Sequence, residues 1–296
     1  MKIIHSYWSK PSLKKKKLNQ FDRNSGGWLD VKYYYYSWVL SCLQFSKFYD
    51  KVELVTDQQG YDLLINKLNL PYARVDVVLD DINDYHPDLW ALGKIYAYGI
   101  QEEPFIHVDG DIFIWDRFED RIENGSLVCQ NIEQIIEYNK YFNHLSSKFN
   151  FIPLELHKSR IQNKVIKVVN AGILGGTNIN FFKNYVNKAF EFVDKNIDKL
   201  HKLDDLGYFN MMFEQFLFYA LSEEKKSDIT CLLPQENGTF DGLADFSGVP
   251  IRTKYIHALG FYKRKQNVCD LLELKLQEDY PEYYFLIKKL LLTHEL

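Results

Sequence analysis

The amino-acid sequence predicts an α/β protein with a mixed, mainly parallel central sheet flanked by helices. Short apolar, β-branched runs alternate with helix-like stretches over residues 1–115. The units are roughly 25 to 30 residues long, a spacing that indicates parallel pairing with crossover connections. Polar residues follow several of these runs, at the edge where parallel sheets bind ligands. Of the 296 residues, 46% are hydrophobic and 26% are charged, a balance typical of globular proteins.

Strands are expected where apolar, β-branched runs are bounded by polar or turn residues. In the first part of the chain these runs lie at residues 2–7, 52–57, 74–79 and 105–115. Helices are expected in the longer stretches between them, at residues 30–49, 60–68 and 87–100. Leu70-Pro71 ends the second helix, because the residue before a proline is disfavoured in the helical conformation.

The second part of the chain is less regular. Its expected strands lie at residues 126–130, 165–169 and 254–256, and its expected helices at residues 132–142, 178–200 and 206–221. Residues 143–164 show no clear periodicity, so we expect a mobile loop there. The sequence from Asn267 onward predicts a helical C-terminal segment interrupted by Pro281.

Composition excludes several classes of protein. A formal net charge of −4 gives no support for nucleic-acid binding. The four cysteines are widely spaced, without a zinc-binding or disulfide pattern. The first apolar run is too short for a signal peptide, and no stretch reaches the length of a transmembrane helix. We therefore expect a reduced, cytoplasmic protein, with the Lys14–Lys17 run solvated or, alternatively, touching an acidic acceptor or a membrane surface.

Asp109-Gly110-Asp111 is the first candidate for a functional site. Its two carboxylates flank one glycine between two apolar runs. Carboxylates this close repel each other unless they share a cation or a proton, and a hard divalent ion carrying phosphate oxygens satisfies both. An acidic turn between strands is an equally good interpretation of the pattern alone. Tyr7 and Asp57 are the last residues of predicted parallel strands, so three polar strand ends are expected at one rim of the sheet.

Three further motifs carry polar or small residues in apolar surroundings. Asn170-Ala171-Gly172 either lets a ligand approach the backbone or forms a tight hairpin turn. Glu214-Gln215 lies in an apolar helix, where the pair either completes an internal network or faces a cleft. The last predicted strand is followed by His257-x-x-Gly260-x-x-Lys263.

In this order the four motifs resemble those of metal-dependent, nucleotide-sugar glycosyltransferases of the GT-A fold. The motif order is most similar to the retaining family 8, which includes glycogenin and bacterial galactosyltransferases. Two departures are visible: Glu214 stands where the family usually has Asp, and no Pro-Trp follows Lys263. The resemblance implies one catalytic domain at residues 1–265, with a nucleotide-binding half at 1–115, a sugar and acceptor half at 116–265, and a packed helical extension at 266–296.

The resemblance also implies roles for individual residues. Asp109, Asp111 and His257 would bind the metal, and two carboxylates with one imidazole suit Mn²⁺ better than Mg²⁺. Other residues would bind the nucleotide and its phosphates: Tyr7 (base), Asp57 (base or ribose), Asp109 (also ribose), the Gly260 amide, Lys263 and Lys94. Lys94 would face the phosphates or the sugar, and a surface lysine is an equally good interpretation of it. The donor sugar would contact Asn170, Ala171, Gly172, Glu214 and Gln215, of which Glu214 and Gln215 would also position groups and stabilise charge during catalysis. The expected reaction moves a hexose from a nucleotide sugar, in the first instance a UDP-sugar, to an acceptor hydroxyl with retention of configuration.

Two alternatives remain open. One is a catalytically degenerate protein of the same fold that binds a nucleotide or carbohydrate. The other is a phosphatase of the haloacid-dehalogenase type, although there the acidic pair follows the first strand and Phe113 here stands where that family has Thr or Val. The acceptor is also open and includes a glycan, a lipid, a small molecule or a peptide, with peripheral membrane contact possible.

Overall fold

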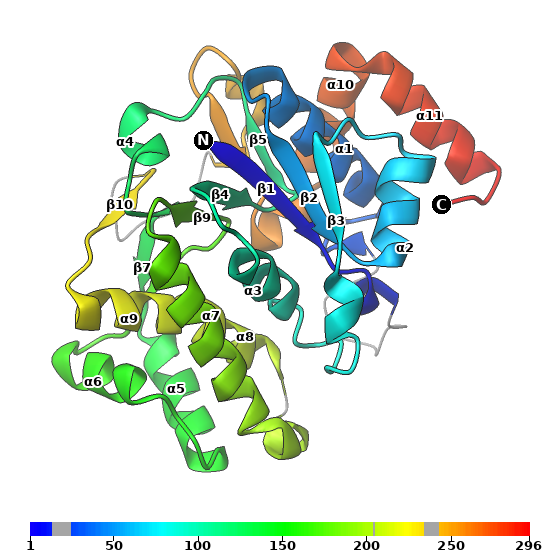
Figure 1. The fold of residues 1–296 in the computed structure, drawn as a ribbon. Coiled ribbons are helices and arrows are strands. Elements are labelled where there is room, and N and C mark those ends of the chain that lie inside the picture. Colours follow the sequence, from blue (N-terminus) through cyan, green and yellow to red (C-terminus); the bar gives the residue numbers. More distant parts are fainter. Residues whose placement is uncertain (14–24, 204, 234–242) are drawn as a thin grey trace. The chain divides into compact units, whose positions relative to one another are not determined.

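The computed structural model describes residues 1–13, 25–203, 205–233 and 243–296 (Figure 1). Its central element is a seven-stranded sheet, and helices flank the sheet. The strands follow one another across the sheet in the order β10 (Ile229–Cys231), β6 (Leu127–Cys129), β9 (Ile173–Gly176), β4 (Phe105–Val108), β1 (Lys2–Tyr7), β2 (Val52–Thr56) and β3 (Arg74–Val77). The predicted α/β class with a mainly parallel sheet is confirmed. The Lys14–Lys17 run lies outside the described residues.

The chain divides into two compact units, each built from separate stretches of sequence. The terminal unit comprises Lys2–Asn83, Val108–Arg117 and Thr239–Leu296. The central unit comprises Met1, Asp84–His107 and Phe118–Gly238. Each unit is defined by the contacts among its residues, and neither unit is one continuous stretch of sequence. The functional halves inferred from the resemblance stay a prediction.

The terminal unit begins with the parallel strands β1, β2 and β3. Helix α1 (Val31–Phe48) connects β1 to β2, and its first turn is capped by the Asp30 side chain, which accepts a hydrogen bond from the Lys32 amide. Short helical turns lead from β2 to β3: α2 (Gln58–Tyr61) and a π-helical turn (Asp62–Lys67). Each predicted strand and helix in this part is confirmed, although β3 ends two residues earlier than expected.

The expected strand at residues 105–115 is wrong in one respect. Two strands occupy this stretch, β4 and β5 (Ile112–Ile114), and the Asp109-Gly110-Asp111 turn separates them. Strand β5 leaves the main sheet and pairs antiparallel with β11 (Tyr255–His257), in a register that places His257 opposite Ile112. This switch between sheets brings the last strand of the chain to the acidic turn.

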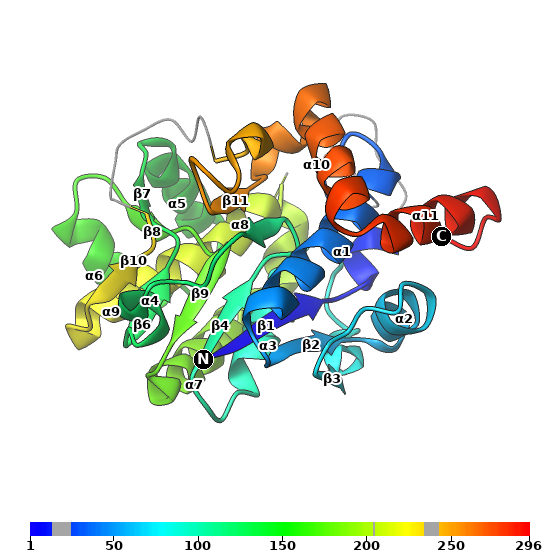
Figure 2. The same cartoon turned by 90° about the horizontal axis from the view of Figure 1, so that it is seen from above.

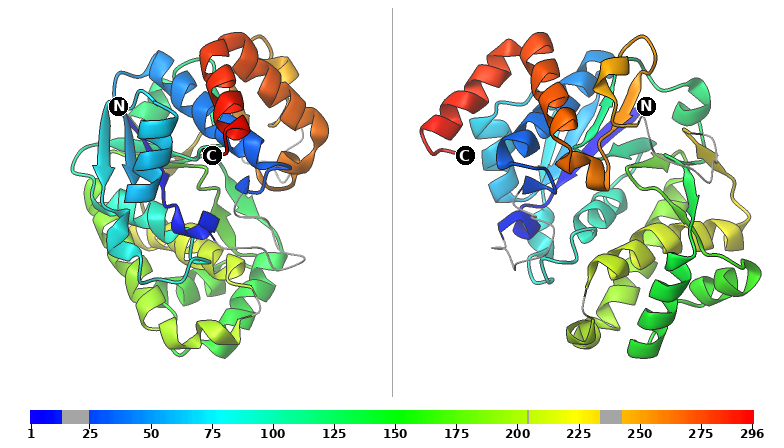
Figure 3. Two further views of the ribbon diagram at one scale, coloured as in Figure 1. Left: turned by 90° about the vertical axis from the view of Figure 1, so that its right-hand side faces the viewer. Right: turned by 180° about the vertical axis from the view of Figure 1, so that it is seen from behind.

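The C-terminal segment is helical, as expected. Helices α10 (Gln266–Asp279) and α11 (Pro281–Leu292) contact α1, and the views in Figures 2 and 3 show both beside it. Lys32 on α1 forms an ion pair of 2.8 Å with Glu273 on α10. Pro281 occupies the first turn of α11. A proline is tolerated there, because the backbone amides of the first turn have no acceptor within the helix. Within the described ranges, no helix has the length and apolar character needed to cross a bilayer.

The central unit contains the parallel pair β10–β6 and the antiparallel pair β6–β9. The helices of this unit include α3 (Leu92–Gly99), α5 (Glu137–Lys148), α6 (Leu154–Gln162), α7 (Ile179–Asp194), α8 (Gly207–Met211) and α9 (Leu217–Lys225). Helix α7 contacts α3 and α9, and α6 contacts α9. A π-helical turn (Met212–Phe216) joins α8 to α9, and a 3-10 helix (Ile197–Lys202) follows α7. A second small sheet pairs β7 (Ile132–Gln134) with β8 (Lys167–Val169).

Several predictions for the central unit are wrong in detail. The expected helix at 132–142 begins as strand β7, and the expected loop at 143–164 contains the second half of α5 and all of α6. Helix α6 is polar, and only Glu155, Leu156 and Ser159 on it are buried, so it shows no apolar period. Polar contacts with other helices hold it instead: Lys188 pairs with Glu155 at 2.6 Å, and Ser159 hydrogen-bonds to Glu223. Helix α3 also starts five residues later than expected, and strand β10 had no prediction.

A buried histidine in the terminal unit predicts a pH-dependent stability. The His5 Nε2 lies 3.0 Å from the Ser41 hydroxyl, and His5 Nδ1 lies 3.0 Å from the Tyr72 hydroxyl. Burial lowers the pKa of His5 from 6.5 to about 3. The unfolded chain therefore binds a proton that the folded chain does not bind between these pH values, and stability falls as the pH falls below 6.5.

Urea unfolding is expected to show a loss of about 2 kcal/mol between about pH 7 and pH 5 from this residue. The variant His144→Gln, at an exposed histidine of the central unit, is expected to retain the same slope. An unfolding free energy that does not change over this interval would contradict a neutral, buried His5.

Candidate metal centre

Helix α1 holds the acidic turn through two serine hydroxyls. Ser37 Oγ donates a hydrogen bond of 2.6 Å to the Gly110 carbonyl, and Ser41 Oγ donates one of 2.7 Å to the Ile112 carbonyl. The two serines are four residues apart, so they lie one helical turn apart on the same face of α1. The amide of Ile112 closes the turn with a hydrogen bond of 3.1 Å to the Asp109 carbonyl. The hydrogen bonds from α1 and the hydrogen bond within the turn therefore hold the conformation of the turn without a ligand.

The turn has no room for a side chain at Gly110. A Cβ at this position would lie 2.6 Å from the Trp38 ring, closer than real Cβ atoms approach other atoms. We expect Gly110→Ala to lower the unfolding free energy by about 1–3 kcal/mol, the usual cost of overpacking. It is also expected to weaken metal binding, because the ring and the turn cannot both keep their positions.

Urea unfolding and a Mn²⁺ titration of Gly110→Ala measure both effects. Gly248→Ala is a control in the same unit, because there the nearest atom to a new Cβ lies at an ordinary 3.5 Å. Equal stability of the two variants would contradict the steric role of Gly110.

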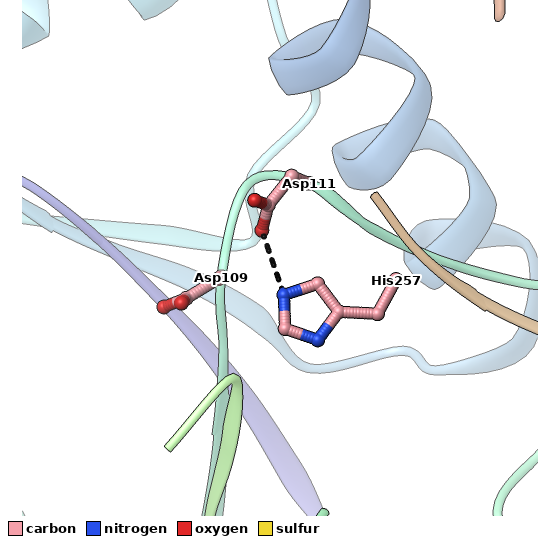
Figure 4. A group of neighbouring side chains, drawn as sticks. All are labelled: Asp109, Asp111 and His257. Carbon is pink, nitrogen blue, oxygen red and sulfur yellow. Dashed lines mark ion pairs between the residues drawn. The ribbon is translucent and has the colours of Figure 1, made fainter. Parts of the chain in front are cut away.

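Pairing of β5 with β11 places His257 beside the acidic turn. The ligand atoms of Asp109, Asp111 and His257 all lie within 4.8 Å of one another (Figure 4). His257 Nε2 is 3.6 Å from Asp111 Oδ1, and the Ala258 amide donates to the Asp111 carbonyl at 3.0 Å. Asp111 and His257 are 7% and 5% exposed, and Asp109 is half-buried. The structure thus brings together all three predicted metal ligands.

The donor set fits a divalent ion. Protein ligands bind such ions at about 2.0–2.6 Å, so three ligand atoms within 4.8 Å of one another can share one ion. Two carboxylates with an imidazole favour Mn²⁺ over Mg²⁺. Burial raises the pKa of Tyr255 well above its usual value, and the negative charges of Asp111 and Asp109 add to this shift.

Lys263 supplies a cation at the same place. Its Nζ forms an ion pair with Asp111 Oδ2 and donates a hydrogen bond of 3.2 Å to the Gly26 carbonyl. The Trp28 ring lies below it, with the ring centre 5.9 Å from Nζ. Gly260 has a φ of +49°, a left-handed conformation that favours glycine, and begins the 3-10 turn Gly260–Arg264 that carries Lys263.

The other two predicted nucleotide-binding residues of this unit lie at adjacent strand ends. Tyr7 ends β1 opposite Thr56, and Asp57 directly follows β2. Tyr7 is 5% exposed, and its ring meets the Trp38 ring edge-on at 5.1 Å. Asp57 Oδ2 accepts hydrogen bonds from the Ser9 amide and hydroxyl, and its Oδ1 accepts one from the Gly60 amide. The fold therefore already uses the Asp57 carboxylate, and the nucleotide-binding roles of Tyr7 and Asp57 stay predictions.

A second polar cluster lies in the central unit. Glu214 is fully buried, and its Oε1 lies 3.0 Å from Lys94 Nζ. Lys94 Nζ also lies 3.5 Å from the Ala171 carbonyl. Glu214 Oε2 has no hydrogen-bond partner within the described part of the chain. The structure thus groups Lys94, Ala171 and Glu214, and Gln215 is the half-buried neighbour of Glu214.

Asn170 is oriented by a residue that the sequence did not indicate. Its Nδ2 donates a hydrogen bond of 2.7 Å to Glu133 Oε1, and the Gly172 amide donates to its Oδ1 at 3.1 Å. Glu133 also accepts a hydrogen bond of 2.7 Å from the Tyr138 hydroxyl. Glu133 lies on β7, in a stretch that was expected to be helical, so no sequence signal placed it opposite Asn170.

The chain was compared with curated protein sequences, solved structures and protein-family models. No curated protein sequence matches the chain. One solved structure, described as the crystal structure of the glycosyltransferase GlyE in Streptococcus pneumoniae TIGR4, matches with a TM-score of 0.46 and 10% sequence identity. The match covers 99% of this chain but spans 63% of that structure, and at this similarity it does not identify a function. A protein-family model described as "Family of unknown function (DUF6734)" matches residues 1–290, and the chain belongs to this family.

Proposed function

We propose that the chain is a metal-dependent glycosyltransferase that moves a hexose from a UDP-sugar to an acceptor hydroxyl with retention of configuration. The observation that carries this proposal is the cluster of Asp109, Asp111 and His257 with Lys263 beside it. A nucleoside diphosphate needs a divalent cation and a further positive group, and this cluster offers sites for both. The four spaced motifs of the sequence resemblance support the same assignment.

Five residues of the terminal unit have specific roles in this proposal. Asp109, Asp111 and His257 would hold a divalent ion, and such an ion would supply Lewis-acid chemistry for departure of the nucleoside diphosphate. Lys263 and the Gly260 amide neutralise charge that develops on the terminal phosphate as the sugar leaves. The Lys263 ammonium already lies beside Asp111, so it would be near a phosphate bound at this cluster.

The central unit supplies groups suited to sugar hydroxyls. Glu214 Oε2 is a buried acceptor, and the other carboxylate oxygen of Glu214 pairs with Lys94. Asn170 is held by Glu133 and by the Gly172 amide, so its amide has a fixed direction. We propose that these groups and Gln215 orient the hexose, and that Lys94 also stabilises negative charge on the donor.

A cytoplasmic location, expected from the sequence, is part of this proposal. For the acceptor, the proposal specifies only that it carries a hydroxyl group.

A donor screen tests the proposal. Purified full-length protein is incubated with Mn²⁺ and a panel of UDP-hexoses, and UDP release is measured with and without EDTA. We expect UDP release from at least one donor, with loss of the activity in EDTA. UDP binding without turnover from any donor would favour the non-catalytic alternative, and hydrolysis of p-nitrophenyl phosphate instead of UDP release would favour a phosphatase.

A further inference from the structure

Two cysteines of the central unit face each other across neighbouring strands. Cys129 on β6 and Cys231 on β10 are register partners in a parallel pair, and their sulfur atoms are 3.8 Å apart. Side chains directly opposite in a sheet point to the same face, and their strands lie about 4.8 Å apart. Disulfides span Cα separations of about 4.4–6.8 Å. The backbone at this pair therefore already has the spacing of a disulfide.

Hydrogen bonds hold the backbone of both strands at the cysteine pair and just after it. The Leu232 amide donates to the Cys129 carbonyl at 2.9 Å, and the Leu233 amide donates to the Gln130 carbonyl at 2.8 Å. Arg121 donates through its guanidinium to the carbonyls of Cys231 and Leu232, at 2.6 and 3.1 Å. These contacts keep β10 against β6, so rotation of the two side chains is enough to join the sulfur atoms.

The two thiols differ in accessibility. Cys129 is fully buried, whereas Cys231 is half-buried and can be reached by a small reagent. Burial, with the neighbouring Cys231 as a smaller cause, raises the pKa of the Cys129 thiol well above its usual value. A reagent from solvent is therefore expected to react first at Cys231, and Cys129 is placed to react second.

We propose that Cys129 and Cys231 form a reversible redox site that exchanges with a low-molecular-weight disulfide such as glutathione disulfide. The Cys231 thiolate attacks one sulfur of glutathione disulfide, forms a mixed disulfide and releases one glutathione thiolate. Cys129 then loses its proton and attacks the Cys231 sulfur, which expels the second glutathione thiolate. The two cysteines together lose two electrons and two protons, and one glutathione disulfide becomes two glutathione molecules.

The disulfide fastens the edge strand β10 to β6. Amide exchange at Leu232 and Leu233 is expected to slow on oxidation, because the local opening of β10 is then restricted. Strand β6 continues into Asn131, whose carbonyl accepts a hydrogen bond of 2.8 Å from the Asn170 amide. An effect of oxidation on sugar binding would rest on the proposed function, whereas formation of the disulfide does not depend on it.

Peptide mapping after incubation in glutathione buffer tests the proposal. The full-length protein is equilibrated with glutathione disulfide, alkylated, digested and analysed by mass spectrometry. We expect a cross-linked peptide that joins Cys129 to Cys231, and its complete loss on addition of dithiothreitol. Cys42 and Cys269 serve as internal controls, because both are buried on helices, α1 and α10, where neither is the strand partner of another cysteine. Both are expected to be recovered in the alkylated, uncross-linked form.

Two variants test the order of attack. Cys129→Ala is expected to accumulate a glutathione adduct at Cys231, since the second thiol is missing. Cys231→Ala is expected to acquire no adduct at Cys129. The proposal is overturned if the wild-type protein shows no cross-link in a buffer that modifies Cys129→Ala, or if Cys42 or Cys269 oxidises as readily as the pair.

Discussion

Replacement of Asp111 by Asn is expected to weaken Mn²⁺ binding by about 100-fold or more. Loss of groups that merely support metal ligands costs about 10–100-fold, and Asp111 is proposed as a ligand itself. The variant keeps the shape of the side chain but removes the negative charge that faces His257 and Lys263. Isothermal titration with Mn²⁺, or the decrease of the free Mn²⁺ signal in electron paramagnetic resonance, measures the change directly.

Asp116→Asn is the matched control for this experiment. Asp116 lies in the same unit, on the surface, where its pairing with Lys254 lowers the pKa of its carboxyl. It contributes no ligand atom to the cluster of three, so its replacement is expected to leave Mn²⁺ affinity unchanged. An Asp111→Asn protein that binds Mn²⁺ as tightly as Asp116→Asn does would refute the metal assignment.

Replacement of Lys94 by Met is expected to reduce the unfolding free energy by about 3–5 kcal/mol, because it leaves a buried carboxylate without its partner cation. Glu214 is 0% exposed, and Lys94 Nζ at 3.0 Å is the cation that balances it. Equilibrium urea unfolding at neutral pH measures the loss. The double variant Lys94→Met with Glu214→Gln is expected to recover much of it, since the amide carries no charge.

Lys158→Met provides the comparison for this pair. Lys158 lies in the same unit and pairs with Glu224 at 2.9 Å, but both side chains are open to solvent. Exposed ion pairs contribute little, so this variant is expected to unfold almost as the wild-type protein does. If Lys94→Met is no less stable than Lys158→Met, the Lys94–Glu214 ion pair does not stabilise the fold. The proposed role of Glu214 Oε2 as an acceptor for the sugar then loses its support.

Much of the fold could be predicted where the local sequence decides the structure. Strands β1 and β2 of the terminal unit are short segments rich in Ile, Val and Leu, and they lie where these residues predicted them. Helix α6 could not be predicted, because polar contacts such as Ser159 with Glu223 hold it in place of an apolar face. Strand β7 likewise depends on pairing with β8, and its own residues do not distinguish a strand from a helix.

The candidate site shows the same division. Residue types and spacing indicated Asp109, Asp111 and His257, and the structure brings these three together. The reason for their proximity, the antiparallel pairing of β5 with β11, joins segments that are far apart in the sequence. The serines of α1 that hold the turn, Ser37 and Ser41, carried no signal, because a hydroxyl in an apolar helix indicates no particular partner.

The metal dependence of nucleotide binding tests the central proposal most directly. UDP is titrated into the wild-type protein by calorimetry, once with Mn²⁺ present and once with EDTA. We predict that UDP binds at one site per chain in Mn²⁺ and that no binding heat is detected in EDTA. Equal UDP affinity under the two conditions would contradict a diphosphate held through an ion at Asp109, Asp111 and His257.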